Sequence, residues 1–179
     1  MDIKKTANLL LNFAINRLSE IFGILISISG TLLLIALLSY SPEDPNFIFP
    51  ENAQIKNILG FKGSFISDLF FQSIGLIAYL VSLTLIITGI NIFLYKEFFL
   101  IIENIFFSII YLILGTLFLA HYYPDAFTLY INGNGGFVGL YMTNTFLKSL
   151  IMINEKLFYY ILIFLNMSFF LISINFRPI

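Results

Sequence analysis

The sequence predicts an all-α, polytopic integral membrane protein with four transmembrane helices. Hydrophobic residues make up 59% of the 179-residue chain and charged residues only 11%, with a mean hydropathy of +0.96. Four stretches of 17 to 27 residues contain no charged side chain: Ile21–Leu38, Leu69–Tyr95, Asn104–Ala120 and Leu157–Phe176. A helix of about 20 apolar residues crosses the hydrocarbon core, where backbone groups must bond within the helix.

These stretches divide the chain into one membrane domain over residues 1–179. We expect helices at about 18–39, 69–95, 100–120 and 155–176, with two long loops at 40–68 and 121–154. The first helix is expected to be a retained span, because residues 1–20 are too polar for a cleavable signal peptide. Within the second long loop, Phe137–Ile153 is partly apolar and contains Lys148. It is expected to form a short interfacial helix or to lengthen the last span.

Basic residues near the spans predict the orientation. Five lie before the first helix, in the short turn between the second and third, or after the fourth: Lys4, Lys5, Arg17, Lys96 and Arg177. Four are spread over the two long loops: Lys56, Lys62, Lys148 and Lys156. Basic residues near span ends favour the cytoplasmic side. We therefore expect both termini in the cytoplasm and the two long loops on the outer side of the membrane.

Composition excludes several classes of site. The net charge is −1 and the basic residues form no cluster, so no direct contact of this segment with nucleic acid is expected. The chain has no cysteine for a disulfide or a thiolate metal site. His121 stands alone in an aromatic segment, and Asp68 and Glu103 lie at span ends. The sequence thus predicts no catalytic, metal-ligating or cofactor-binding residues, and no enzyme.

Small residues mark a candidate helix-packing face. Gly75, Ala78, Ser82 and Gly89 recur along one face of the second helix, and Gly23 and Ser27 form a shorter series in the first. Small side chains let helix backbones approach closely in lipid. This pattern fits packing among the four helices, and it also fits packing against another subunit or a partner membrane protein.

Four further motifs carry a family resemblance. Leu37–Pro45 has two prolines bracketing two acids after the first helix, and Asn57–Phe71 leads into the second. Gly75–Tyr79 continues that helix, and Gly135–Gly139 precedes the fourth; this run lacks the Lys-Ser/Thr of a phosphate-binding loop. In order and in helix count, the chain resembles the four-helix N-terminal membrane domain of the FtsK/SpoIIIE DNA translocases.

The resemblance implies a multi-pass anchor in the bacterial inner membrane that targets a DNA translocase to the division septum, in cell division and chromosome segregation. It also implies self-association and contacts with other division membrane proteins, besides the lipid bilayer. The DNA motor of that family is expected to be absent from this chain. The first long loop is the candidate partner-contact surface, through Pro42, Asp44, Pro45, Gly60, Gly63 and Asp68. As alternatives, a small transporter or channel subunit would fit the helix count, and a membrane enzyme would need a His or carboxylate cluster.

Overall fold

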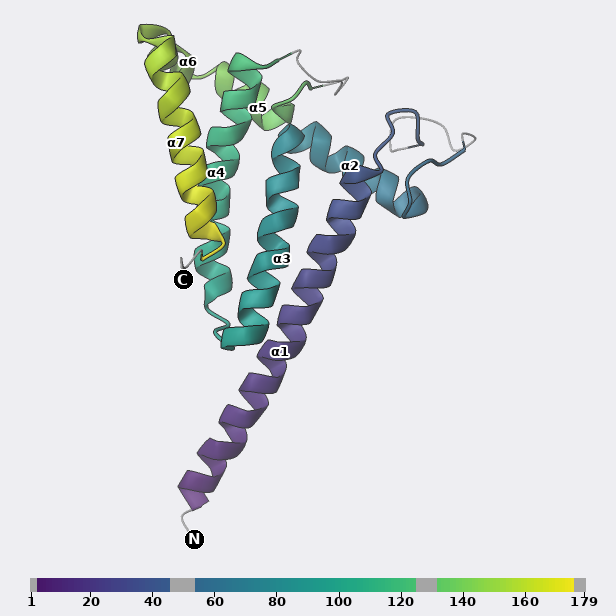
Figure 1. Cartoon of the computed structure of the whole chain (residues 1–179), viewed down its shortest axis with the longest axis vertical. Coiled ribbons are helices and arrows are strands. Elements are labelled where there is room, and N and C mark those ends of the chain that lie inside the picture. The colour runs from purple at the N-terminus through teal and green to yellow at the C-terminus, as the bar shows by residue number, and fades with distance from the viewer. Residues whose placement is uncertain (1–2, 46–53, 125–131, 176–179) are drawn as a thin grey trace.

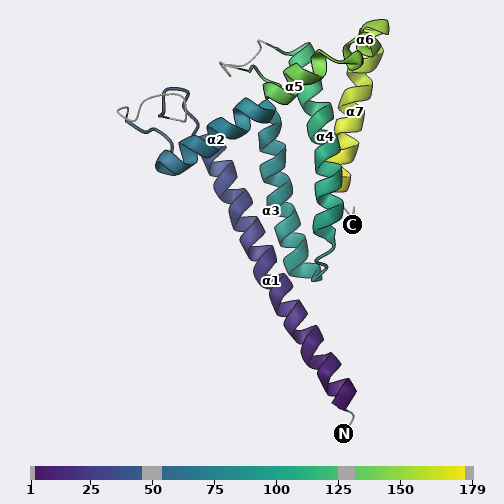
Figure 2. The same cartoon turned by 180° about the vertical axis from the view of Figure 1, so that it is seen from behind.

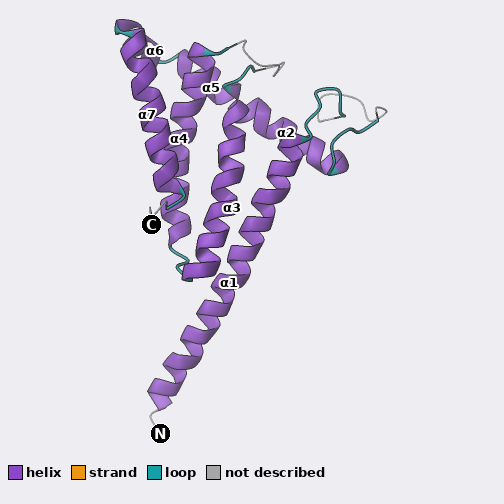
Figure 3. Ribbon diagram, in the orientation of Figure 1, coloured by secondary structure: helices purple, strands orange, loops and turns teal. Residues whose placement is uncertain are grey.

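The regular elements of the described residues are all helical. A computed structural model describes residues 3–45, 54–124 and 132–175 (Figure 1). Four segments in this part are long and apolar enough to cross a membrane: Asn8–Leu38, Gly60–Tyr95, Leu100–Tyr122 and Glu155–Ser173. The elements are α1 (Ile3–Leu38), α2 (Gly60–Ile74), the 3-10 turn η1 (Gly75–Ile77), α3 (Ala78–Tyr95), α4 (Leu100–Tyr122), α5 (Gly136–Thr143), α6 (Phe146–Ile153) and α7 (Glu155–Ser173) (Figure 3). The predicted fold class is confirmed: the chain is a multi-pass, all-α membrane protein.

The first helix begins earlier than the expected residue 18. α1 has 36 residues, about 54 Å at 1.5 Å per residue, whereas the hydrocarbon core is about 30 Å thick. Its first half projects past the other helices and its second half lies beside α3 (Figures 1 and 2). A helix satisfies its own backbone hydrogen bonds in water as well as in lipid, so it need not end where the apolar stretch ends.

The expected second helix, 69–95, is two helices joined at a break. α2 starts at Gly60, inside the segment expected to be a loop, and α3 starts at Ala78. Between them Gly75 has φ +58° and ψ −144°, a backbone conformation that glycine adopts far more readily than other residues and that ends α2. Figure 1 shows α2 turning away from α3 and lying across the top of α1. The apolar pattern spans both helices because hydropathy does not register the backbone turn.

Polar side chains link α3, α4 and α7 within the bundle. Thr84 and Tyr111 share a hydroxyl hydrogen bond of 3.0 Å, and Asn104 donates to Thr88 at 2.8 Å. Asn166 donates to the carbonyl of Tyr111 at 2.6 Å. Such bonds between helices hold spans together where lipid offers no competing partner. The fourth helix, expected to reach residue 176, ends at Ser173.

The second long loop contains two short helices, not one. α5 and α6 are bent by 71° relative to each other, and Thr145 caps α6 by accepting the backbone N–H of Leu147 at 3.3 Å. Ile151 is buried against α4 and α7, while Phe146 and Ile153 are exposed. This one-sided burial agrees with the interfacial helix expected here, although Asn144 and Thr145 interrupt it.

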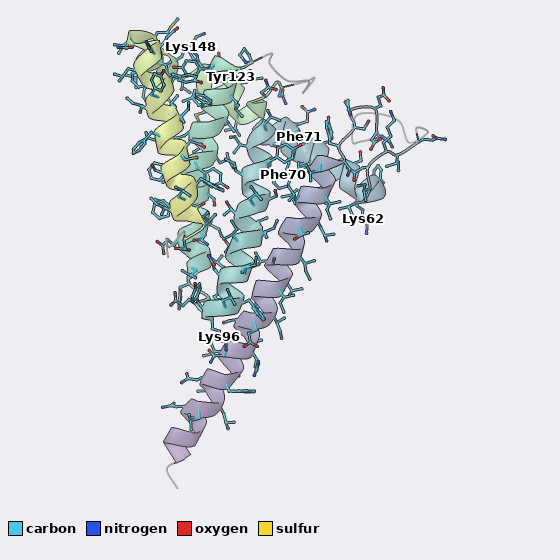
Figure 4. The ribbon with its side chains drawn as sticks, viewed as in Figure 1. Lys62, Phe70, Phe71, Lys96, Tyr123 and Lys148 are labelled. Carbon is cyan, nitrogen blue, oxygen red and sulfur yellow. The ribbon has the colours of Figure 1, made fainter. Side chains whose placement is uncertain are left out.

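The two ends of the bundle carry different sets of basic residues. At the α3–α4 turn, here called the Lys96 end, Glu20 pairs with Arg17 at 2.5 Å and with Lys96 at 3.1 Å. The end of α7 lies at the same end, since Asn91 donates to the carbonyl of Ile174 at 2.9 Å. Figure 4 shows Lys62 and Lys148 toward the opposite end. Arg17 and Lys96 are therefore separated in space from Lys62 and Lys148, as the sequence predicts, and Arg177 lies outside the described residues.

Candidate functional site

The first long loop is braced internally by Asp44. Its carboxylate accepts the backbone N–H groups of Lys56 and Asn57, both at 2.8 Å. Asp44 as a whole residue is only 1% exposed. Two parts of the loop that are separated by the undescribed residues 46–53 are thus held together by one acid. A carboxylate that accepts two backbone N–H bonds is a strong acceptor, which favours this turn.

Asn57 connects the same loop to the end of α1. Its Nδ2 donates to the carbonyl of Ala36 at 2.9 Å, and its Oδ1 accepts the N–H of Leu59 at 3.0 Å. Gly63 of α2 lies against this amide, and a Cβ there would overlap Asn57 Oδ1. The Asn57 amide therefore satisfies a carbonyl at the end of α1 and the backbone N–H of Leu59, the residue before α2.

Most of the residues assigned to partner contact are buried. Asp44, Pro45, Gly63 and Asp68 are covered, whereas Pro42 is exposed and Gly60 is half-buried. Ser64 donates to the carbonyl of Pro45 at 3.1 Å, which seats the loop on α2. The partner contact stays a prediction, but the carboxylates of Asp44 and Asp68 and the carbonyl of Pro45 are used for hydrogen bonds inside the domain.

Asp68 lies in the middle of α2, not at a helix start. Tyr40 donates its hydroxyl to Asp68 Oδ1 at 3.2 Å, and Gln72 approaches the same oxygen at 3.5 Å. Tyr40 also packs edge-on against Phe71, with ring centroids 4.8 Å apart. Tyr79 adds a hydrogen bond of 3.3 Å to the carbonyl of Leu37. These contacts fix the crossing of α1, α2 and α3.

The exposed acid beside Asp44 has a different role. Glu43 forms an ion pair with Lys56. The hydrogen bond and charge of Lys56 hold the pKa of Glu43 below its usual value, and Glu43 raises the pKa of Lys56. Both side chains are largely in solvent, where such pairs contribute little to stability.

The glycine-rich turn, Asn132–Gly136, packs against the break at Gly75. Asn132 donates to the backbone carbonyl of Gln72 at 3.0 Å, and Leu76 donates its N–H to the carbonyl of Asn134 at 3.0 Å. Gly136 has φ +63°, and a Cβ there would lie 2.5 Å from the nitrogen of Gly75. Two motifs far apart in the sequence thus meet backbone to backbone.

Among the small residues predicted to form one face of the second helix, Gly75 is the one that the structure places elsewhere. Gly89 packs against Gly23 and Ser27 at the α1–α3 contact, where a Cβ on Gly23 would lie only 2.6 Å from the carbonyl oxygen of Gly89. Ala78 belongs to the core with Leu33, Leu37, Phe71 and Ile74, and Ser82 is fully buried. Gly75 instead contacts the glycine-rich turn. The φ of Gly75 rotates it out of the helical register that the spacing assumes.

Sequence reasoning did not single out several residues of this site. Tyr40, Asn57, Gln72, Tyr79 and Asn134 carry the hydrogen bonds that join the motifs. Three of them, Tyr40, Asn57 and Tyr79, lie within the family motifs, and this position in the motifs is the feature of the sequence that could have identified them. We name the whole set the motif cluster: Ser39–Pro45, Asn57–Tyr79 and Asn132–Gly136. In the described part of the chain, no three His, Asp or Glu residues are grouped as a metal site would require.

The sequence of this chain is similar to one region of known DNA translocases. Residues 16–176 match the family described as the 4TM region of DNA translocase FtsK/SpoIIIE. A DNA translocase FtsK from Azospirillum brasilense is 32% identical over 87 residues, which cover 48% of this chain and 14% of that protein. The DNA translocase FtsK of Rickettsia bellii is 32% identical over a stretch that covers 41% of this chain and 10% of that protein. The DNA translocase FtsK of Caulobacter vibrioides is 34% identical over a stretch that covers 38% of this chain and 8% of that protein. The match thus spans a small part of each relative. No solved structure matches the chain.

Proposed function

The chain belongs to the family of the 4TM region of DNA translocase FtsK/SpoIIIE, and from this membership we propose that it targets an FtsK-type translocase to the division septum. The family match covers most of the first span, the other three spans in full and every part of the motif cluster. The chain is the membrane anchor region of such a translocase. Septal targeting, chromosome segregation and contacts with division membrane proteins are the proposed roles of that anchor.

Charge supports the orientation in this proposal. α1 begins at the Lys96 end of the bundle with Lys4, Lys5 and Arg17 in its first half, and α7 returns to that end. Basic residues close to span ends favour the cytoplasmic side. We therefore place both termini in the cytoplasm and the motif cluster on the outer side of the inner membrane.

The exposed part of the first long loop is the proposed partner surface. Pro42 and Glu43 are exposed at one side of it, and Ile55 and Ile58 at the other, with Ile58 76% exposed. The buried brace from Asp44 to Asn57 holds these side chains in a fixed arrangement. An apolar side chain that is exposed and held rigidly loses little entropy on binding a partner.

Self-association is proposed along the first half of α1. Leu9, Leu11 and Phe13 are largely exposed there, beyond the contact of α1 with α3. Copies that pack through this segment would bury that apolar surface and bring their N-termini together. Cysteine crosslinking between copies measures this contact. Leu11→Cys is expected to form crosslinks, and Leu94→Cys on α3 is the control position that should not.

Localisation tests the septal role. A fluorescent fusion of residues 1–179 is expected to collect at the division site, and uniform fluorescence in normally dividing cells would contradict the proposal. Ile58→Glu should weaken the septal signal while membrane insertion is kept, because it places a charge on the proposed partner surface. Ile153→Glu is the matched control, since Ile153 on α6 is also 76% exposed. Equal loss with both variants would exclude a specific role for the first loop.

A further inference from the structure

A groove of about 520 Å³ lies between the second half of α1 and the underside of α2. Leu32, Leu33 and Ala36 form its α1 wall, and Ile66 and Phe70 form its α2 wall. Ser29 also lines it, but its hydroxyl donates to the carbonyl of Leu25 at 2.9 Å. The groove is therefore apolar in practice. Its α1 wall lies within a membrane span, so its surroundings are lipid.

Among the residues described, one charged side chain lines this groove. Lys62 is exposed in the first turn of α2 and takes part in no ion pair within the described part of the chain. Figure 4 shows Lys62 on the side of α2 away from the first loop, with Phe70 toward the same side. A lysine in such a place extends its ammonium group to the headgroup level while its stem stays on apolar surface.

The face of α2 around Lys62 is apolar and uncovered. Phe61, Phe65 and Leu69 recur every four residues and are exposed, and Ile66 is 41% exposed. A helix with an apolar face lies in the interface between headgroups and acyl chains. α2 crosses the end of α1, and Lys62 lies within this apolar face of α2.

From this arrangement we propose that the α1–α2 groove binds one anionic phospholipid. An acyl chain occupies the groove along Leu32 and Phe70, and the phosphate of the headgroup pairs with the Lys62 ammonium. Charge complementarity selects an anionic lipid, because the charge that Lys62 brings to the groove is positive. The bound lipid fills the space between α1 and α2 and stabilises the crossing that positions the motif cluster.

Native mass spectrometry of the full chain in detergent tests the headgroup contact. The chain is titrated with phosphatidylglycerol or phosphatidylcholine that carry the same acyl chains. The first lipid bound should be phosphatidylglycerol in preference to phosphatidylcholine. Lys62→Gln should lower that preference about fivefold, which corresponds to one basic residue at an anionic surface. Lys148→Gln, at the same end of the bundle on α6, should leave it unchanged.

A second pair of variants tests the groove itself. Ser29→Phe fills it and should abolish the first bound lipid. Thr31→Phe is the matched control: Thr31 is also exposed on α1 and bonds its own helix at 2.9 Å, but it does not line the groove. Circular dichroism verifies that each variant is folded. If Ser29→Phe does not fold, the effect of Lys62→Gln on lipid preference alone tests the proposed lipid site.

Three outcomes would overturn the proposal. Equal retention of the two lipids by the unmodified chain excludes an anionic site. If Lys62→Gln and Lys148→Gln lower the preference for phosphatidylglycerol equally, that preference comes from the overall positive charge at this end of the bundle and not from a site at Lys62. If Ser29→Phe leaves lipid binding intact and removes a dimer mass, the groove is a contact with a second copy. The lipid measurement is independent of septal localisation, so each proposal can fail without the other.

Discussion

Gly75 and Asn134 are in direct backbone contact, although 59 positions separate them in the sequence. A Cβ on Gly75 would overlap the carbonyl oxygen of Asn134, and that same oxygen accepts the N–H of Leu76 at 3.0 Å. The break between α2 and α3 is thus closed by a loop that precedes the last span. The N–H groups of Gly75 and Leu76 are satisfied by carbonyls of Phe71 and Asn134, as a buried backbone requires.

Replacing Gly75 should test this closure. Gly75→Ala adds an atom at the carbonyl of Asn134 and keeps a residue with a side chain at φ +58°. Gly60→Ala is the control, because Gly60 has φ +66° but nothing within 4 Å of a Cβ. The positive φ alone costs about 1–2 kcal/mol, and overlap adds about 1–3 kcal/mol. Unfolding in detergent should show the larger loss for Gly75→Ala, and equal losses would exclude the contact.

The α1–α3 crossing depends on a second pair of glycines. Gly89→Ala would place a Cβ 2.5 Å from the carbonyl of Gly23. The same Cβ would overlap the backbone nitrogen of Ser27. Because backbone atoms cannot rotate away as a side chain can, α1 and α3 must move apart. We expect the free energy of unfolding to fall by about 1–3 kcal/mol. Leu94→Ala changes a side chain on the same helix that is 59% exposed. It should change stability much less, and a larger effect at Leu94 would refute this crossing.

Asp44 should matter more than its neighbour Glu43. Asp44→Ala leaves the N–H groups of Lys56 and Asn57 without their acceptor. Leaving a buried donor unpaired costs about 1–3 kcal/mol. Hydrogen exchange at the amides of Lys56 and Asn57 should therefore accelerate. Glu43→Ala removes only an exposed ion pair and should leave both amides protected. Unchanged protection after Asp44→Ala would show that the brace is dispensable.

Single-cysteine labelling should establish the orientation, because the chain has no cysteine of its own. Lys148→Cys lies on α6, and Glu97→Cys lies in the exposed α3–α4 turn. If both termini are in the cytoplasm, a maleimide that reaches the outer face of the inner membrane but cannot cross it should label Lys148→Cys in intact cells. Glu97→Cys should react only after the inner membrane is opened. The reverse pattern would invert the proposed topology.

The spans could be predicted because hydropathy is a local property. Each apolar stretch meets lipid wherever its neighbours lie, so Asn104–Ala120 alone requires a helix, and α4 runs from Leu100 to Tyr122. The separation of Lys96 from Lys148 follows in the same way from an alternating path through the membrane. The break at Gly75 did not follow, since a glycine within an apolar run fits a continuous helix as well as a turn.

The sequence by itself determined the class, the number of spans and the family resemblance, which depend on composition and on the order of short motifs. The tertiary structure decided what the motif residues do. Asp68 meets Tyr40 across 28 positions, and Asn57 meets Ala36 across 21. The same acid or amide can cap a helix, face a partner or brace a loop. Which role it takes depends on the donors and acceptors that folding brings within hydrogen-bond distance, and one segment of sequence does not contain that information.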